Sequence, residues 1–228
     1  MIKNIIECFA IEHGFELINN DTKLENHNEN LSYLMQWDGD KKRFLALFES
    51  NKIIPPQELN DLVNKNASET LKLDPAFERN TDLIILHQLD YRADFKMIEN
   101  DVFNIEENPY YFKKYFLYFS KEELALLDGH NIKSLTKVVT DVREFSEYRK
   151  NPLNPSLYSV AARIFIKIPF LKVPIKEGNL KPIQIYLDEA LKEKGVHELY
   201  EGILSKKDNG ELPEEIIRSL INEAMENS

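Results

Sequence analysis

Hydrophobic residues at the start of the chain recur at helical spacing. They stand at i, i+3, i+4 and i+7 in the order Ile2, Ile5, Ile6 and Phe9. One face of a helix with 3.6 residues per turn has this spacing, so we expect a helix over residues 2–12. Gly14 can end that helix in a left-handed conformation. Cys8 lies beside the apolar face, and we expect it to be a small core residue.

The following residues, up to position 90, have the pattern of strands with short helices between them. Alternation over 15–18 predicts a strand, and the polar stretch 19–30 predicts a loop. Strands are expected over 31–37 and 43–49, because Asp38-Gly39-Asp40 between them is typical of a hairpin turn. Helices are expected from Pro55 to about residue 65 and over 68–73. The apolar run 82–89 predicts an interior strand.

From Tyr91 onward the pattern favours helices. The segment Pro109–Phe119 is dense in aromatic residues on more than one side at helical spacing, which predicts a helix buried on several sides that joins the two halves. Ser120 and Glu123 form a capping box for the next helix. Further helices are expected over 133–148, 156–166, 182–194, 196–205 and 214–225.

These patterns predict an α+β fold: a small N-terminal sheet of about four strands flanked by helices, followed by a mostly helical C-terminal half. We expect an α+β region with a β-hairpin over residues 1–105 and a helical region over 106–228. The two regions are expected to form one compact unit.

The charge of the chain is negative but unevenly distributed. The net charge is −10, which argues against a protein whose whole surface binds nucleic acid. Residues 149–181 contain seven Lys or Arg residues and one acid, Glu177. The single cysteine fits a reducing compartment, and no window is apolar enough to span a membrane, so we expect a cytoplasmic protein.

The basic segment leaves two functional interpretations open. Clustered cations can bind along nucleic-acid phosphates, or they can pair with an acidic partner surface. A structural interpretation also stays open, in which these charges only keep a proline-rich surface hydrated. The residues concerned are Arg149, Lys150, Arg163, Lys167, Lys172 and Lys176.

Catalytic motifs are scarce in this sequence. It has no phosphate-binding glycine motif and no histidine pair at metal-ligand spacing, so we predict neither a cofactor nor a metal site. His87 lies in the apolar run 82–89 and is expected to be a core histidine. A metal-dependent nuclease of the restriction type remains an alternative, with Asp38 and Glu49 holding the cation and Lys52 near the attacking water.

Two segments resemble a known protein family. Asn80-Thr81-Asp82-Leu83-Ile84-Ile85-Leu86 and Glu106-Glu107-Asn108-Pro109-Tyr110-Tyr111-Phe112-Lys113-Lys114-Tyr115 are similar to the middle component of prokaryotic ABC-three-component conflict systems, the Lamassu type among them. The resemblance covers roughly residues 1–150 and extends to a helical remainder.

The resemblance implies a non-enzymatic adaptor in an anti-phage or anti-plasmid defence complex. Its partners would be an SMC-like ABC ATPase that senses DNA and an effector, often a nuclease, with DNA reached through the complex. Residues expected to contact a partner come from the second segment: Tyr110, Tyr111, Phe112, Lys113, Lys114 and Tyr115. A stand-alone inhibitor or immunity protein is a third possibility that the negative charge permits.

Overall fold

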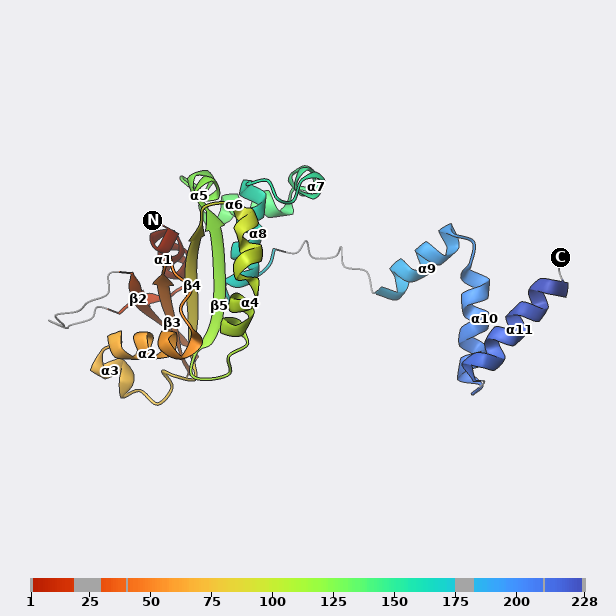
Figure 1. Ribbon diagram of the computed structural model, residues 1–228, viewed down its shortest axis with the longest axis horizontal. Coiled ribbons are helices and arrows are strands. Elements are labelled where there is room, and N and C mark those ends of the chain that lie inside the picture. Colours follow the sequence, from red (N-terminus) through yellow and green to blue (C-terminus); the bar gives the residue numbers. More distant parts are fainter. Residues whose placement is uncertain (1, 19–29, 40, 175–182, 211, 227–228) are drawn as a thin grey trace. The chain divides into compact units, whose positions relative to one another are not determined.

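The computed structural model describes residues 2–18, 30–39, 41–174, 183–210 and 212–226 (Figure 1). The chain divides into two compact units, residues 1–174 and 175–228. The first unit holds a sheet covered by helices, and the described residues of the second form three helices. The expected division between residues 105 and 106 lies inside the first unit, where α4 (Phe95–Glu106) ends.

A five-stranded mixed sheet forms the centre of the first unit, with the strands in the order of the chain. The strands are β1 (Glu16–Leu17), β2 (Leu31–Asp38), β3 (Lys41–Glu49), β4 (Thr81–Leu89) and β5 (Lys113–Ser120). The strands from β1 to β3 are antiparallel, and β3, β4 and β5 are parallel. Parallel neighbours need a crossover, and α2 (Pro56–Asn66) with α3 (Glu69–Lys72) and then α4 supply the two crossovers.

Helices cover both faces of the sheet. On one face, α2, α3 and α4 pack on a core that includes Phe44, Phe77 and Phe116. On the other face the core takes side chains from α1 (Ile2–Glu12), α5 (Lys121–Leu126), α6 (Ile132–Thr140) and α8 (Leu157–Lys167). The α+β class predicted from the sequence is confirmed, and Gly14 ends α1 with φ +86° as expected.

The prediction of a helix over Pro109–Phe119 is wrong, because this segment is a turn followed by β5. Phe116 points to the core beneath α4, whereas Leu117 and Phe119 point to the core beneath α8. Successive strand residues face opposite sides, and here both sides are apolar. The segment therefore lacks the polar alternation by which a strand is recognised, and its aromatic residues fit either spacing.

The capping box at the end of β5 is confirmed. The Ser120 side chain accepts a hydrogen bond from the Glu123 backbone N–H, and the Glu123 side chain accepts one from the Ser120 N–H. The single helix expected over 133–148 is instead two helices, α6 and α7 (Val142–Lys150). Asp141 separates them, since its carboxylate caps the N-terminus of α7 through the N–H groups of Arg143 and Glu144.

The second unit consists of α9 (Ile183–Glu193), α10 (His197–Asp208) and α11 (Pro213–Glu226). Lys206 of α10 bonds to Ser219 of α11. Among the side chains that the structure describes in this unit, Ile216 is the one apolar side chain that is buried. No helix in the described ranges combines the length and the apolar character needed to cross a membrane.

Candidate functional site at the start of strands β4 and β5

The two segments that carry the family resemblance meet at one end of the sheet. One leads into β4 and the other leads from α4 into β5. These strands are parallel, and their register places Asp82 beside Lys113 and Leu83 beside Lys114. Segments far apart in the sequence therefore form one surface at the N-terminal ends of neighbouring strands.

The turn between α4 and β5 is organised around the side chain of Lys114. This residue is only 4% exposed. Its Nζ donates hydrogen bonds to Asn108 Oδ1 at 3.0 Å, to the Tyr110 carbonyl at 2.7 Å and to the Phe112 carbonyl at 3.0 Å. The Asn108 carbonyl is a fourth, more distant acceptor at 3.5 Å, so the three shorter bonds match the three protons of an ammonium group. Burial nevertheless lowers the pKa of Lys114 to about 8.

The same turn holds two tyrosines in solvent. Tyr110 is 65% exposed and Tyr111 is 46% exposed. Tyr111 has φ +62°, in the left-handed region that bulky residues rarely adopt and that costs about 1–3 kcal/mol. The carbonyls on either side of Tyr111 are the ones that Lys114 binds, so the buried ammonium offsets this strain. The turn thus presents two aromatic side chains on a fixed backbone.

The six residues expected to contact a partner do not share one environment. Phe112 is buried and packs edge-on against Phe77, with ring centroids 5.7 Å apart. Lys113 is exposed, and its Nζ lies 5.7 Å from the ring centroid of the half-buried Tyr115. With Lys114 buried, the members that are available on the surface are Tyr110, Tyr111 and Lys113.

The described cations of the basic segment fall into two groups, one on the surface and one engaged in contacts within the protein. Arg149 and Lys150 are exposed on α7, where Lys150 pairs with Glu147 at 2.5 Å. Lys172 is exposed, and Lys176 lies outside the described residues. Arg163 and Lys167 of α8 instead make internal contacts.

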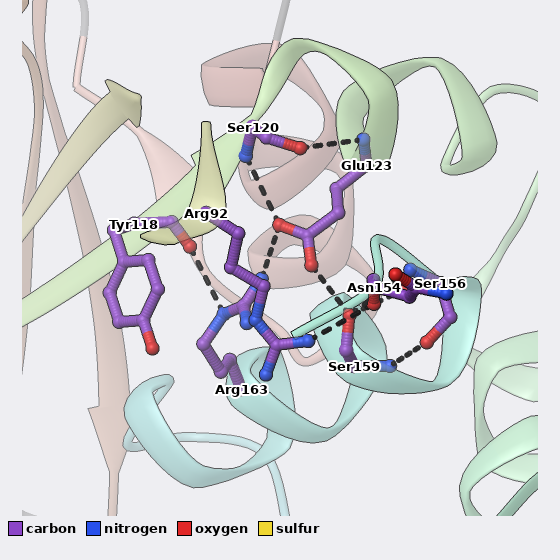
Figure 2. Close-up of polar contacts among 8 residues, drawn as sticks. All are labelled: Arg92, Tyr118, Ser120, Glu123, Asn154, Ser156, Ser159 and Arg163. Atoms are coloured by element: carbon purple, nitrogen blue, oxygen red, sulfur yellow. Dashed lines mark hydrogen bonds and ion pairs between the residues drawn. The ribbon is translucent and has the colours of Figure 1, made fainter. Parts of the chain in front are cut away.

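Figure 2 shows that Arg163 completes a buried network around Glu123. Glu123 is fully buried and accepts hydrogen bonds from the Ser120 N–H at 3.1 Å and from Ser159 Oγ at 2.5 Å, in addition to its ion pair with Arg163. Arg163 also donates from Nε to the Tyr118 carbonyl at 3.2 Å. Burial raises the pKa of Glu123, but the ion pair and hydrogen bonds outweigh it and hold this pKa below its usual range.

Side chains from α4 and α8 cap the free edge of β5. Glu106 accepts a hydrogen bond from the Phe116 N–H at 2.8 Å, and Lys167 holds Glu106 at 2.6 Å. The Tyr118 carbonyl on the same strand is bound by Arg163. An edge strand normally offers such groups to another strand, so two residues of the basic segment close this edge of the sheet.

The residues of the nuclease alternative are spread along the β2–β3 hairpin. Asp38 pairs with Lys41 at the start of β3, and Glu49 is the last residue of that nine-residue strand. At the usual rise per residue this separates Asp38 from Glu49 by about 25 Å. Lys52 follows after the strand has ended. Within the described ranges no three His, Cys, Asp or Glu residues are grouped so as to hold a metal ion.

The predicted core histidine is confirmed, and the predicted core cysteine is wrong. His87 is 5% exposed and its Nδ1 lies 2.8 Å from the Ser50 carbonyl. Burial lowers the pKa of His87, although the bond to Ser50 acts in the opposite direction. Cys8 is exposed, because it lies on the outer side of α1.

A basic pocket at this end of the sheet was not predicted from the sequence. Its volume is about 270 Å³, and it is lined by Lys41, Lys42, Arg43, Arg79, Asn80, Asp82 and Lys113. The cations come from three separate segments: the basic run Lys41-Lys42-Arg43, the loop residue Arg79 and the strand residue Lys113. The strand register alone brings them together.

The fold and the site describe an α+β protein that carries an aromatic turn and a basic pocket at one end of a mixed sheet. Residues 43–142 match the family model described as ABC-three component (ABC-3C) system Middle Component 1. The matched range contains both motif segments and covers less than half of the chain. It supports the resemblance to ABC-3C middle components, whereas the Lamassu type stays a prediction. No curated protein and no solved structure gives a significant match.

Proposed function

We propose that this protein is the non-catalytic accessory subunit of an ABC-3C defence complex, in which it binds an SMC-like ABC ATPase and links it to an effector. The match over residues 43–142 supports an accessory subunit of such a system. The bridging role is our own extension of that match. It is consistent with the sequence, which has no nucleotide-binding motif of its own.

The exposed tyrosine turn carries this proposal. Tyrosine is enriched among the residues that dominate binding energy at protein interfaces. Tyr110 and Tyr111 are exposed although the surrounding turn is held by Lys114 and lies within the matched range. A backbone fixed before binding loses little conformational freedom on association. We therefore assign the ATPase contact to Tyr110, Tyr111 and the neighbouring Lys113.

Co-expression with the product of a neighbouring ABC ATPase gene, followed by size-exclusion chromatography, tests the proposal. We expect one co-eluting complex. The double variant Tyr110→Ala/Tyr111→Ala should weaken binding by at least about 30-fold, which corresponds to about 2 kcal/mol. A matched control is Tyr91→Ala/Phe103→Ala, whose side chains are 72% and 48% exposed in the same unit.

Different failures of this experiment have different meanings. Independent elution of the two wild-type proteins contradicts the proposed function and favours a stand-alone inhibitor or immunity protein. Equal binding by both double variants leaves the complex in place and contradicts the assignment of the contact to the turn. The effector link is tested separately by adding the effector to the preformed complex and measuring whether it co-elutes.

The nuclease alternative makes a separate prediction. If Asp38, Glu49 and Lys52 formed a catalytic site, the purified chain would cleave DNA with Mg²⁺ or Mn²⁺. We expect no cleavage, because Asp38 ends β2 beside the start of β3, whereas Glu49 is the last residue of β3. Cleavage that is lost in Glu49→Gln would overturn the non-catalytic assignment.

A further inference from the structure

The basic pocket at the start of β3, β4 and β5 has more positive charge than it can neutralise. Five cations and one carboxylate, Asp82, line its volume of about 270 Å³. The net charge of the lining is therefore +4, in a protein whose overall net charge is −10. Such a local reversal of sign concentrates anions at the pocket.

Two of the cations are already engaged by acidic side chains. Arg43 donates from Nε and Nη2 to Asp82 Oδ2, at 3.1 and 2.8 Å. Lys42 pairs with Asp74 at 2.5 Å. These two ion pairs engage Asp82 and Asp74, the acidic side chains that the described residues place against the pocket cations.

The other three cations remain available to a ligand. Lys41 and Arg79 are exposed and make no ion pair with any described residue, and Lys113 is exposed beside the ring of Tyr115. They come from β3, from the loop before β4 and from β5, so they approach the pocket from different sides. This arrangement fits a compact anion that can accept hydrogen bonds on several sides.

We propose that this pocket binds a phosphate group. A phosphate monoester has three unesterified oxygens and up to two negative charges, enough for Lys41, Arg79 and Lys113 together, and successive diesters of a nucleic-acid backbone bring one charge each to the same cations. A carboxylate has two oxygens and one charge, and Asp82 already occupies that role for Arg43. The phosphate belongs either to a nucleic-acid backbone or to a small phosphorylated molecule. The site shares Lys113 with the proposed ATPase contact, but it requires neither the two tyrosines nor the assembly, and its test uses the chain alone.

Fluorescence anisotropy with a short labelled single-stranded DNA, using the full-length chain alone, tests the site. We expect a dissociation constant in the range of about 1–100 µM at low salt. The charge-reversal triple Lys41→Glu/Arg79→Glu/Lys113→Glu should weaken binding at least tenfold. If it removes three phosphate contacts, the slope of log affinity against log salt should fall by about 2.

A matched control has the same change in net charge away from the pocket. It is Lys65→Glu/Lys133→Glu/Lys137→Glu, three exposed lysines on α2 and α6. At about 0.1 M salt, where the Debye length is about 10 Å, we expect its affinity to stay within about threefold of wild type, because charges farther than this from the pocket are screened. Circular dichroism shows whether the charge-reversal variant is folded. If it is not, the same loss of DNA affinity is measured with the neutral triple Lys41→Gln/Arg79→Gln/Lys113→Gln.

Competition identifies the source of the phosphate. Displacement of the DNA by inorganic phosphate or a nucleoside monophosphate assigns a site for a single phosphate group. Displacement by unlabelled DNA alone assigns contacts along a backbone. The proposal is overturned if wild type does not bind the labelled DNA, if the pocket and control triples lose affinity equally, or if polyglutamate competes while the phosphate compounds do not.

Discussion

Replacement of Lys114 with Met tests whether the buried ammonium fixes the tyrosine turn. The change keeps most of the apolar length of the side chain and removes the donor of three hydrogen bonds of 3.0 Å or less. Two opposing contributions determine the result. A pKa of about 8, below the ordinary 10.5, means that burying the charge costs about 3 kcal/mol, and the variant recovers this free energy. Lost bonds cost about 1 kcal/mol each, and the buried Phe112 carbonyl adds about 1–3 kcal/mol.

The net free energy of unfolding should therefore fall by only about 1–3 kcal/mol. Urea denaturation followed by circular dichroism at pH 7 measures this change. The local effect should be larger than the global one, because the amides of Asn108 and of residues 110–113 lie in the turn whose carbonyls lose the ammonium group. Hydrogen exchange should become faster there and stay slow in β4. A loss above about 5 kcal/mol, or unchanged exchange in the turn, would refute this reasoning.

The pH dependence gives a second readout of the same substitution. In the folded protein the pKa of Lys114 lies below its unfolded value, so the unfolded chain binds more protons between about pH 8 and 10.5. The contribution of Lys114 to the free energy of unfolding therefore rises with pH across that window. The stability difference between wild type and Lys114→Met should increase by up to about 3 kcal/mol from pH 7 toward pH 10.5. Exposed Lys113→Met serves as the control, and a flat difference contradicts the assignment.

Three further substitutions test the supporting structure. Arg163→Met leaves the carboxylate of Glu123 buried without its cation, so urea denaturation should show a loss of about 3–5 kcal/mol, and a smaller loss in Arg163→Met/Glu123→Leu. Glu106→Ala uncovers the Phe116 N–H at the edge of β5; light scattering should detect aggregation that Glu106→Gln, which keeps an acceptor, avoids. Wild type should lose stability as the pH falls below the ordinary His87 pKa of 6.5, whereas His87→Gln should lose less. Equal acid sensitivity of the two would contradict the buried neutral histidine.

Local signals in the sequence were sufficient for much of the fold. The helix over 2–12, the hairpin around Gly39 and the capping box of Ser120 and Glu123 each depend on residues close together in the chain. The break between α6 and α7 also had such a signal, because Asp141 is a favoured N-cap residue. A long apolar period across it concealed that signal.

The aromatic segment and the pocket could not be predicted from local patterns. Helices cover both faces of β5, so its residues show no alternation, and Lys114 is buried in a turn whose form the spacing of apolar residues does not indicate. The cations of the pocket come from three places in the sequence, residues 41–43, 79 and 113, and only the parallel register places Asp82 next to Lys113. Arg163 looked like a surface charge because its partner, Glu123, is 40 positions away.

The cap on the edge of β5 also sets an order of events during synthesis. Strand β5 ends at Ser120, and Arg163 follows it by 43 positions. At about 5–20 residues per second a ribosome needs about 2–9 s to supply that cap. Until then the Tyr118 carbonyl faces outward without its arginine, and a neighbouring nascent chain can pair with it. A message truncated between these positions would make this brief exposure permanent.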